Sequence, residues 1–195
     1  MEKMIQKNKN NTMRPDLQKS LKHSHIDPRQ LSTLQRILLT TDGTLTEILE
    51  AYFFEKIYVF KLSQRLVTLK DSMKSLNLRK KSTVLERKIL LQGKVSRKNF
   101  IYAQSLIVPD RFDKRVQEEL ERSKKPVGQL WLEHKIETFK EIIDSGKESA
   151  NELADYFHIA KEDLLLSRTY RVFSNKKPIM MITEKFPESF FRDEF

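Results

Sequence analysis

The chain has 195 residues, a formal net charge of +10 and no cysteine. A chain of this length fits one domain and buries about 70% of the surface that it would expose unfolded, so folding needs neither a disulfide nor a metal. The lack of cysteine excludes thiol nucleophiles, zinc–thiolate sites and iron–sulfur clusters. The positive charge is compatible with nucleic acid, an anionic membrane surface or a small anionic substrate. Much of it is spread over the N-terminal segment and predicted turns, as expected of a solvated surface.

The N-terminal segment is rich in Lys, Asn and Gln and contains no apolar run long enough for a signal peptide or a membrane span. We expect residues 1–27 to form a flexible tail and residues 28–195 to form the folded domain. The expected protein is cytoplasmic, makes no contact with a membrane, and is a monomer or a small homo-oligomer.

Two helices are predicted before the first strand. Leu and Ile recur at helical spacing from Leu31 to Leu38, and the run ends at the turn signal of residues 40–43. Thr44 and Glu47 have the spacing of a capping box, in which each side chain binds a backbone amide of the other residue. We therefore expect a second helix to start there, and its apolar face consists of Leu45, Ile48, Leu49, Tyr52 and Phe53.

From residue 57 onward the apolar period changes toward two, which predicts strands near residues 57–69, 83–92 and 100–108. Asp110 is expected to cap the helix that follows them. The apolar residues of that helix are Phe112, Val116 and Leu120.

The C-terminal half is predicted to contain two helices and a hairpin. The clearest helical stripe is formed by Leu132, Ile136, Phe139 and Ile143. It ends at residues 145–146, and residues 148–166 have a helical pattern as well. Strands at residues 168–173 and 179–186 then flank a turn over residues 174–178. Helices grouped around strands with short connections indicate a single α+β domain with an antiparallel sheet.

Two charged residues stand on otherwise apolar faces of predicted strands. Arg87 shares its face with Leu85, Ile89 and Leu91, and Glu184 shares its face with Met180, Ile182 and Phe186. Arg and Glu are seldom fully buried unless they are paired. Either the two residues pair with each other, or a bulge moves one of them to the surface, or they form an internal site. In such a site a guanidinium binds a carboxylate, and a carboxylate hydrogen-bonds or exchanges a proton with a substrate oxygen. Periodicity leaves these interpretations open.

Several familiar kinds of site are missing from the sequence. The four glycines are too scattered for a dinucleotide fingerprint or a phosphate-binding loop, and no GxSxG motif occurs. The four histidines show no spacing typical of metal ligands. An enzyme with this sequence is expected to work without metal, nucleotide or covalent serine chemistry.

Five blocks of the sequence resemble the chorismate pyruvate-lyases, in particular their mycobacterial and archaeal branch. The blocks occur in the order of the family and span about residues 31–192. They are residues 39–49 (LTTDGTLTEIL), 84–93 (VLERKILLQG), 103–111 (AQSLIVPDR), 126–128 (PVG) with 136–141 (IETFKE), and 168–187 (RTYRVFSNKKPIMMITEKFP).

The resemblance implies a six-stranded antiparallel sheet flanked by helices, with an internal ligand pocket. It also implies site residues: Arg87 matches the arginine that holds the ring carboxylate, and Glu184 matches the glutamate that faces the ring hydroxyl. Backbone amides at positions matching Leu45 and Val127 complete the carboxylate site. Val127 replaces the Leu of the ubiquinone-pathway enzymes, which should leave a slightly roomier pocket.

The implied reaction splits chorismate into 4-hydroxybenzoate and pyruvate without a cofactor. Chorismate carries a second carboxylate on its enolpyruvyl group, so a second cation is expected. Arg168 and Arg171 are candidates because both lie on a predicted strand of the hairpin.

Two other functions remain as alternatives. The same fold serves as an effector-binding domain in bacterial regulators, so a non-catalytic binder of small aromatic acids is the first alternative. Nucleic-acid binding, suggested by the charge, is not expected, because Phe53, Phe139 and Phe173 fall among apolar neighbours instead of alternating with basic residues on one face.

Overall fold

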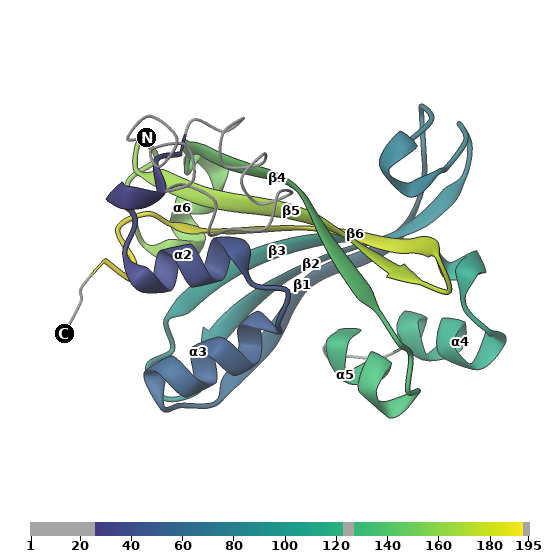
Figure 1. Ribbon diagram of the computed structural model, residues 1–195, viewed down its shortest axis with the longest axis horizontal. Helices are drawn as coiled ribbons and strands as arrows, with labels where there is room; N and C mark the ends of the chain where they lie inside the picture. Colours follow the sequence, from purple (N-terminus) through teal and green to yellow (C-terminus); the bar gives the residue numbers. More distant parts are fainter. Residues whose placement is uncertain (1–25, 123–126, 193–195) are drawn as a thin grey trace, which may run out of the picture.

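The computed structural model describes residues 26–122 and 127–192, which form one antiparallel sheet and a set of short helices (Figure 1). The strands are β1 (Ile57–Thr68), β2 (Thr83–Gly93), β3 (Asn99–Ile107), β4 (Phe139–Ser149), β5 (Leu164–Ser174) and β6 (Lys177–Pro187). The α-helices are α2 (Thr33–Thr40), α3 (Leu45–Phe53), α4 (Lys114–Arg122), α5 (Val127–Glu133) and α6 (Ala154–Phe157). Single 3-10 turns are η3 (Pro28–Gln30), η4 (Lys74–Leu76), η5 (Pro109–Arg111) and η6 (Asn151–Leu153).

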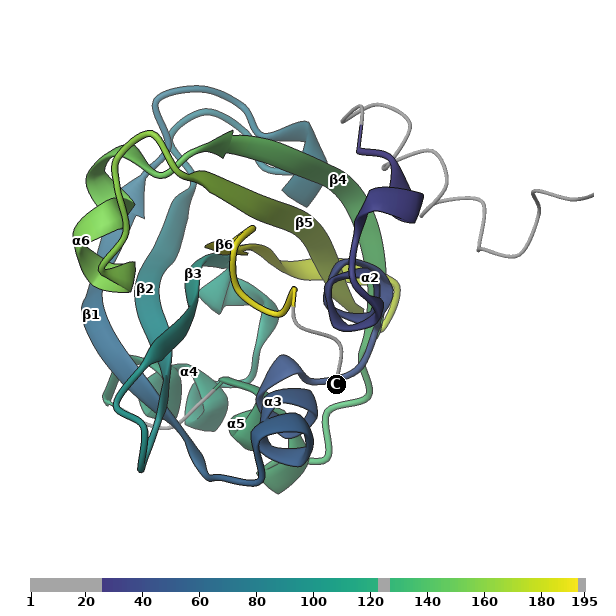
Figure 2. The same ribbon diagram turned by 90° about the vertical axis from the view of Figure 1, so that its left-hand side faces the viewer.

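The sheet joins two three-stranded meanders. Its strand order is β1-β2-β3-β6-β5-β4, and the first and second halves of the chain meet where β3 pairs with β6. The sheet curves strongly, and α2 and α3 lie on its concave side (Figure 2). The fold class and the antiparallel sheet expected from the sequence are thereby confirmed.

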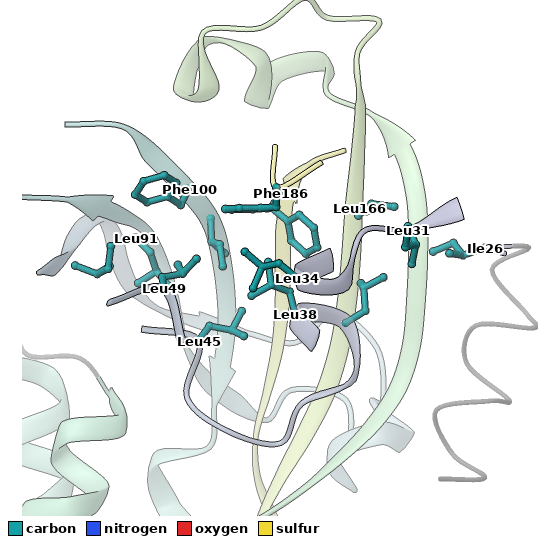
Figure 3. Packing of buried hydrophobic residues seen from close by; sticks show 14 residues of the cluster. Ile26, Leu31, Leu34, Leu38, Leu45, Leu49, Leu91, Phe100, Leu166 and Phe186 are labelled. Carbon is teal, nitrogen blue, oxygen red and sulfur yellow. The ribbon is translucent and has the colours of Figure 1, made fainter. Parts of the chain in front are cut away.

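Two groups of helices cover the inner face of the sheet. Helices α2 and α3 pack on one end of it, together with the last residues of the chain; Leu34 and Leu38 of α2 lie near Leu45 and Leu49 of α3 (Figure 3). Helices α4 and α5 pack on the other end through a second cluster that includes Val116, Leu120 and Leu130. The small helix α6 covers the outer face instead, where it contacts buried residues of β2, β3 and β5.

The helix starts differ from the two predicted caps, Thr44 and Asp110, and include one at Ser32 that was not predicted. Ser32 caps α2 with a complete capping box: its hydroxyl accepts from the amide of Gln35, whose side chain accepts from the amide of Ser32. Thr44 precedes α3 but makes no side-chain cap bond, so the capping box predicted there is wrong. Asp110 lies within η5, and Asp113 is the residue that binds the first-turn amide of α4.

The two helices predicted after residue 128 are largely wrong. In the first of them only residues 127–133 are helical, and residues 139–149 form the edge strand β4. The predicted stripe is not a buried face, because Leu132 is 73% exposed and Phe139 is 62% exposed. Residues 148–166 contain the end of β4, a single turn and the four-residue α6. Pairing of β4 with β5 overrides the local helical period here.

The C-terminal hairpin is confirmed, with longer strands and a shorter turn than expected. Asn175 and Lys176 form a two-residue connection, and both have positive φ (49° and 62°), as a type I′ turn requires.

The first described residues belong to the packed domain. Ile26 is buried in the cluster of α2 and α3, and the Asp27 side chain accepts a bond from the amide of Arg29 at the start of η3. The remainder of the tail predicted for residues 1–27 lies outside the described residues. No helix in the described part of the chain is long and apolar enough to cross a membrane.

Candidate active site

A cavity of about 570 Å³ lies on the inner face of the sheet, between the two groups of helices. Ligand pockets in proteins fall in the range of roughly 300–1,000 Å³. The central strands supply its floor, and α3 and α5 contribute their first residues, Leu45 and Val127. Apolar floor residues include Val59, Ile89, Leu91, Val172, Met180 and Ile182.

The strand register places Arg87 and Glu184 on the same face. Arg87 of β2 lies opposite Ser105 of β3. Glu184 of β6 lies opposite Ala103 of the same strand β3. Because directly paired residues share a face, and residues two apart on one strand do too, both charged side chains point into the cavity that they line. The two residues are two strands apart and are offset by two residues along the strands. In an ideal sheet this displacement puts their Cα atoms about 12 Å apart. The parity of the strands therefore identified two charged residues of the cavity floor, Arg87 and Glu184.

Arg87 is buried on β2 between aliphatic neighbours. Its exposed fraction is 2%, and burial lowers the pKa of the guanidinium from its usual value. An arginine keeps its charge over the whole accessible pH range, so the cavity carries a fixed positive charge at this point.

Glu184 forms an ion pair with Arg168 of the neighbouring strand β5. Its Oε2 accepts a bond from Nε of Arg168 at 2.7 Å, and its Oε1 accepts one from the hydroxyl of Tyr170 at 3.1 Å. Arg168 also donates from Nη1 to the carbonyl of Thr41 at 2.6 Å, which ties β5 to the loop before α3. Burial, and next the Glu184 carboxylate, raise the pKa of Tyr170 well above its usual value, so the phenol stays protonated and donates.

The two arginines proposed for a second anion have different positions. Arg168 points to the inner face and is 1% exposed, where it holds Glu184. Arg171 lies on the opposite face of β5, away from the cavity, and pairs with Glu141 at 2.6 Å and with the carbonyl of Ser75. Arg171 is not among the described residues that line this cavity. Arg168 and Arg171 are three residues apart on β5, and residues three apart on a strand point to opposite faces. The sequence alone could therefore have shown that only one of them reaches the inner face.

Lys140 lines the cavity but was not identified from the sequence. It lies on β4 opposite Val172, and its Nζ donates to the carbonyl of Gly43 at 3.2 Å. The sequence did not indicate Lys140 as a cavity residue because residues 132–143 have the period of a helix. Recognition of a strand that starts at Phe139 would have placed it on the inner face.

Within residues 26–122 and 127–192, no three His, Asp or Glu side chains are close enough together to hold a metal ion.

Fold and cavity together define an α+β protein with a ligand-sized apolar chamber that contains a buried arginine and a buried glutamate. The family model of Rv2949c-like chorismate pyruvate-lyases matches residues 39–192. The chain is 32% identical over 166 residues to the chorismate pyruvate-lyase of Mycobacterium leprae, covering 85% of this chain and 79% of that protein. It is 31% identical over 172 residues to that of Mycobacterium tuberculosis, covering 85% of each. The chain thus belongs to the Rv2949c-like chorismate pyruvate-lyase family.

Solved structures resemble this fold at low sequence identity. The effector domain of PhnF from Mycobacterium smegmatis aligns with a TM-score of 0.57 at 12% identity, over 74% of this chain and 88% of that one. This likeness concerns the fold alone.

Proposed function

We propose that this protein splits chorismate into 4-hydroxybenzoate and pyruvate in the cavity between sheet and helices. One observation carries the proposal: a buried arginine and a buried glutamate lie on the floor of one apolar cavity. A para-substituted ring with a carboxylate at one end and a hydroxyl at the other fits between two such groups. Membership of the lyase family supports the same substrate.

Arg87 would bind the ring carboxylate through its planar guanidinium, which matches the two oxygens of a carboxylate. The amides of Leu45 and Val127 would complete this subsite. Leu45 begins α3, where backbone N–H groups favour an anion, and Thr44 makes no side-chain cap bond to the first turn of that helix. Val127 is the first described residue of α5 and lines the cavity as well.

Glu184 would accept a hydrogen bond from the ring hydroxyl. A carboxylate has about four lone-pair positions, and the bonds from Arg168 and Tyr170 occupy two of them. Those two donors fix the orientation of the carboxylate, so it is ready to hold the hydroxyl-bearing carbon in one place.

In the reaction, the ether bond between the ring and the enolpyruvyl oxygen breaks and the adjacent hydroxyl-bearing carbon loses its proton. The electrons of that C–H bond complete the aromatic ring, and those of the ether bond leave with the oxygen. The departing enolpyruvate takes up one proton at carbon and becomes pyruvate. Aromatisation makes the step favourable, so the protein mainly has to orient the substrate and assist one proton transfer.

The test is to incubate the purified protein with chorismate in buffer containing EDTA and to measure both products. We expect equal amounts of 4-hydroxybenzoate and pyruvate, without any added nucleotide or metal. Chorismate that stays intact after prolonged incubation contradicts the proposal. Chorismate that is bound but unchanged indicates instead a non-catalytic binder of small aromatic acids.

A further inference from the structure

The cavity carries a second positive charge that the proposed contacts with the ring do not use. Among the described residues that line it, the cationic side chains are Arg87 and Lys140. Lys140 is supplied by the edge strand β4, whereas Arg87 lies on β2 at the other side of the sheet. Three strands, β3, β6 and β5, separate the two cations in the sheet.

The ammonium of Lys140 is held at the wall of the cavity. Its Nζ lies 3.2 Å from the carbonyl oxygen of Gly43 and 5.7 Å from the centre of the Tyr170 ring. An ammonium has three N–H donors, and the Gly43 carbonyl accepts one of them. The remaining donors can bind an anion in the cavity that Lys140 lines.

The charges around Lys140 come from several elements. Burial lowers its pKa, the nearby carboxylates of Glu184, Asp42 and Glu47 raise it, and Arg168 lowers it. The ring of Tyr170, whose hydroxyl donates to Glu184, lies 5.7 Å from the Lys140 ammonium. The ammonium is therefore on the Glu184 side of the cavity.

The chemistry of chorismate matches this position. Its ether carbon is next to the hydroxyl-bearing ring carbon, so the enolpyruvyl carboxylate must lie on the side of the group that binds the hydroxyl. If Glu184 binds the hydroxyl, the second carboxylate falls near Glu184 and far from Arg87. Arg168 and Arg171, the cations expected from the sequence, are already engaged with Glu184 and Glu141.

We propose that Lys140 binds the enolpyruvyl carboxylate and makes the site favour the dianionic substrate over the monoanionic product. This inference rests on the function proposed above. The carboxylate that Lys140 binds leaves with pyruvate, whereas the one that Arg87 binds stays with 4-hydroxybenzoate. Lys140 therefore contributes to substrate binding and not to retention of the aromatic product.

The test compares Lys140→Met with Lys147→Met. Lys147 is on the same strand but pairs with Glu188 and does not line the cavity, so its variant removes an equal charge elsewhere. For each protein, kcat/KM with chorismate is measured by product formation. The dissociation constant of 4-hydroxybenzoate is measured through the fluorescence of Trp131, the one tryptophan in the chain, which lines the cavity.

For Lys140→Met we expect kcat/KM for chorismate to fall roughly 10- to 150-fold, the effect of one hydrogen bond to a charged group, mainly through KM. The dissociation constant of 4-hydroxybenzoate should change less than about threefold. Lys147→Met should resemble the wild type in both measurements. Because 4-hydroxybenzoate binding also reports an intact cavity, a misfolded variant is recognised directly, and Lys140→Gln then replaces it.

Three outcomes would overturn the inference. Unchanged kcat/KM in both Lys140 variants shows that the second carboxylate binds elsewhere. An equal loss of chorismate and 4-hydroxybenzoate affinity shows that Lys140 has no preference for the substrate. A wild-type protein that leaves chorismate intact contradicts the proposed function itself, and the Lys140 subsite with it, whereas normal wild-type turnover confines any failure to Lys140.

Discussion

Arg87 occupies a buried position where an aliphatic residue would not require the desolvation of a charge. Its neighbours on the inner face of β2 are Leu85 and Ile89, and its side chain is 2% exposed. Desolvation of an ion costs several kcal/mol in a protein interior, a cost that packing alone does not offset. A fixed buried charge that lines a ligand-sized cavity is what the proposed binding of the ring carboxylate requires.

Arg87→Met is expected to weaken binding of both chorismate and 4-hydroxybenzoate. Loss of one member of a desolvated charge pair typically costs about 2–5 kcal/mol, because the other charge stays buried without its partner. Titration of each variant with 4-hydroxybenzoate, followed by Trp131 fluorescence, measures the effect. Lys88→Met is the matched control, since Lys88 is adjacent on β2 but faces the other side of the sheet. Wild-type product affinity in a folded Arg87→Met protein would place the anion subsite elsewhere.

The buried pair of Arg168 and Glu184 combines a structural role with the proposed catalytic one. The two side chains are 1% and 9% exposed, and Arg168 reaches the loop before α3 through the Thr41 carbonyl. Removing one member of a buried pair leaves an uncompensated charge, while removing both is often tolerated. Stability and activity are therefore separable at this site.

Arg168→Met alone should lower the free energy of unfolding by about 3–5 kcal/mol. The double variant Arg168→Met with Glu184→Leu should be more stable than Arg168→Met, because no lone carboxylate remains, yet it should not turn over chorismate. Urea denaturation and product assays on the single and double variants measure the two properties. If the double variant loses as much free energy of unfolding as the two single variants together, the broken ion pair is not the source of the destabilisation. If the double variant turns over chorismate, Glu184 is not part of the site.

At the scale of elements, the caps of α2 and α3 differ in kind. The Ser32 hydroxyl accepts from the amide of Gln35 and donates to the carbonyl of Phe191 near the C-terminus. Thr44 makes no side-chain cap bond, although both residues directly precede a helix. The start of α2 is thus fixed by its own cap, whereas the start of α3 faces the cavity.

Ser32→Ala is expected to destabilise the protein by about 0.5–2 kcal/mol, the usual effect of losing an N-cap side chain. Thr44→Ala, the same kind of change at the start of α3, should cost less than about 0.5 kcal/mol, because no cap bond is lost. Thermal or urea unfolding of the two variants measures the difference. Equal destabilisation would mean that Thr44 caps α3 in solution.

At the scale of the whole molecule, the two ends of the described chain hold each other. The Gln35 side chain of α2 donates to the carbonyls of Glu188 and Phe190 at 2.7 and 3.0 Å. Ile26 and Phe191 belong to the same buried cluster. This cluster supports α3, which supplies one wall of the cavity, so the chain ends stabilise the site without touching it.

Removal of residues 1–25 is expected to leave kcat/KM for chorismate within about twofold, because these polar residues precede the segment that matches the family. Removal of residues 1–27 should also retain turnover but lower the free energy of unfolding by about 1.5–3 kcal/mol, since it removes the buried Ile26. Steady-state kinetics and urea unfolding of both truncated proteins provide the comparison. Loss of most activity in the folded shorter deletion would show that residues 1–25 contribute to the site.

The sequence alone determined the strands β1, β2, β3 and the C-terminal hairpin, and the burial of Arg87 and Glu184 within them. Side chains alternate between the faces of any strand, so one charge among aliphatic residues of equal parity is a local signal. That signal needs no knowledge of which strands are neighbours. It was reliable here because β2, β3 and β6 are interior strands with strongly apolar inner faces.

Only the tertiary structure decided the rest of the site. Residues 132–143 have a helical period, yet β5 pairs with β4 from Phe139 onward, and a bulge between Ile142 and Asp144 obscures the strand alternation. Lys140 therefore reaches the cavity through a pairing that no local pattern specifies. The partner of Glu184 depends in the same way on the register of β5 against β6, which places Arg168 directly opposite. Local periodicity fixes which face a residue occupies, but contacts between segments distant in the sequence fix which residues meet there.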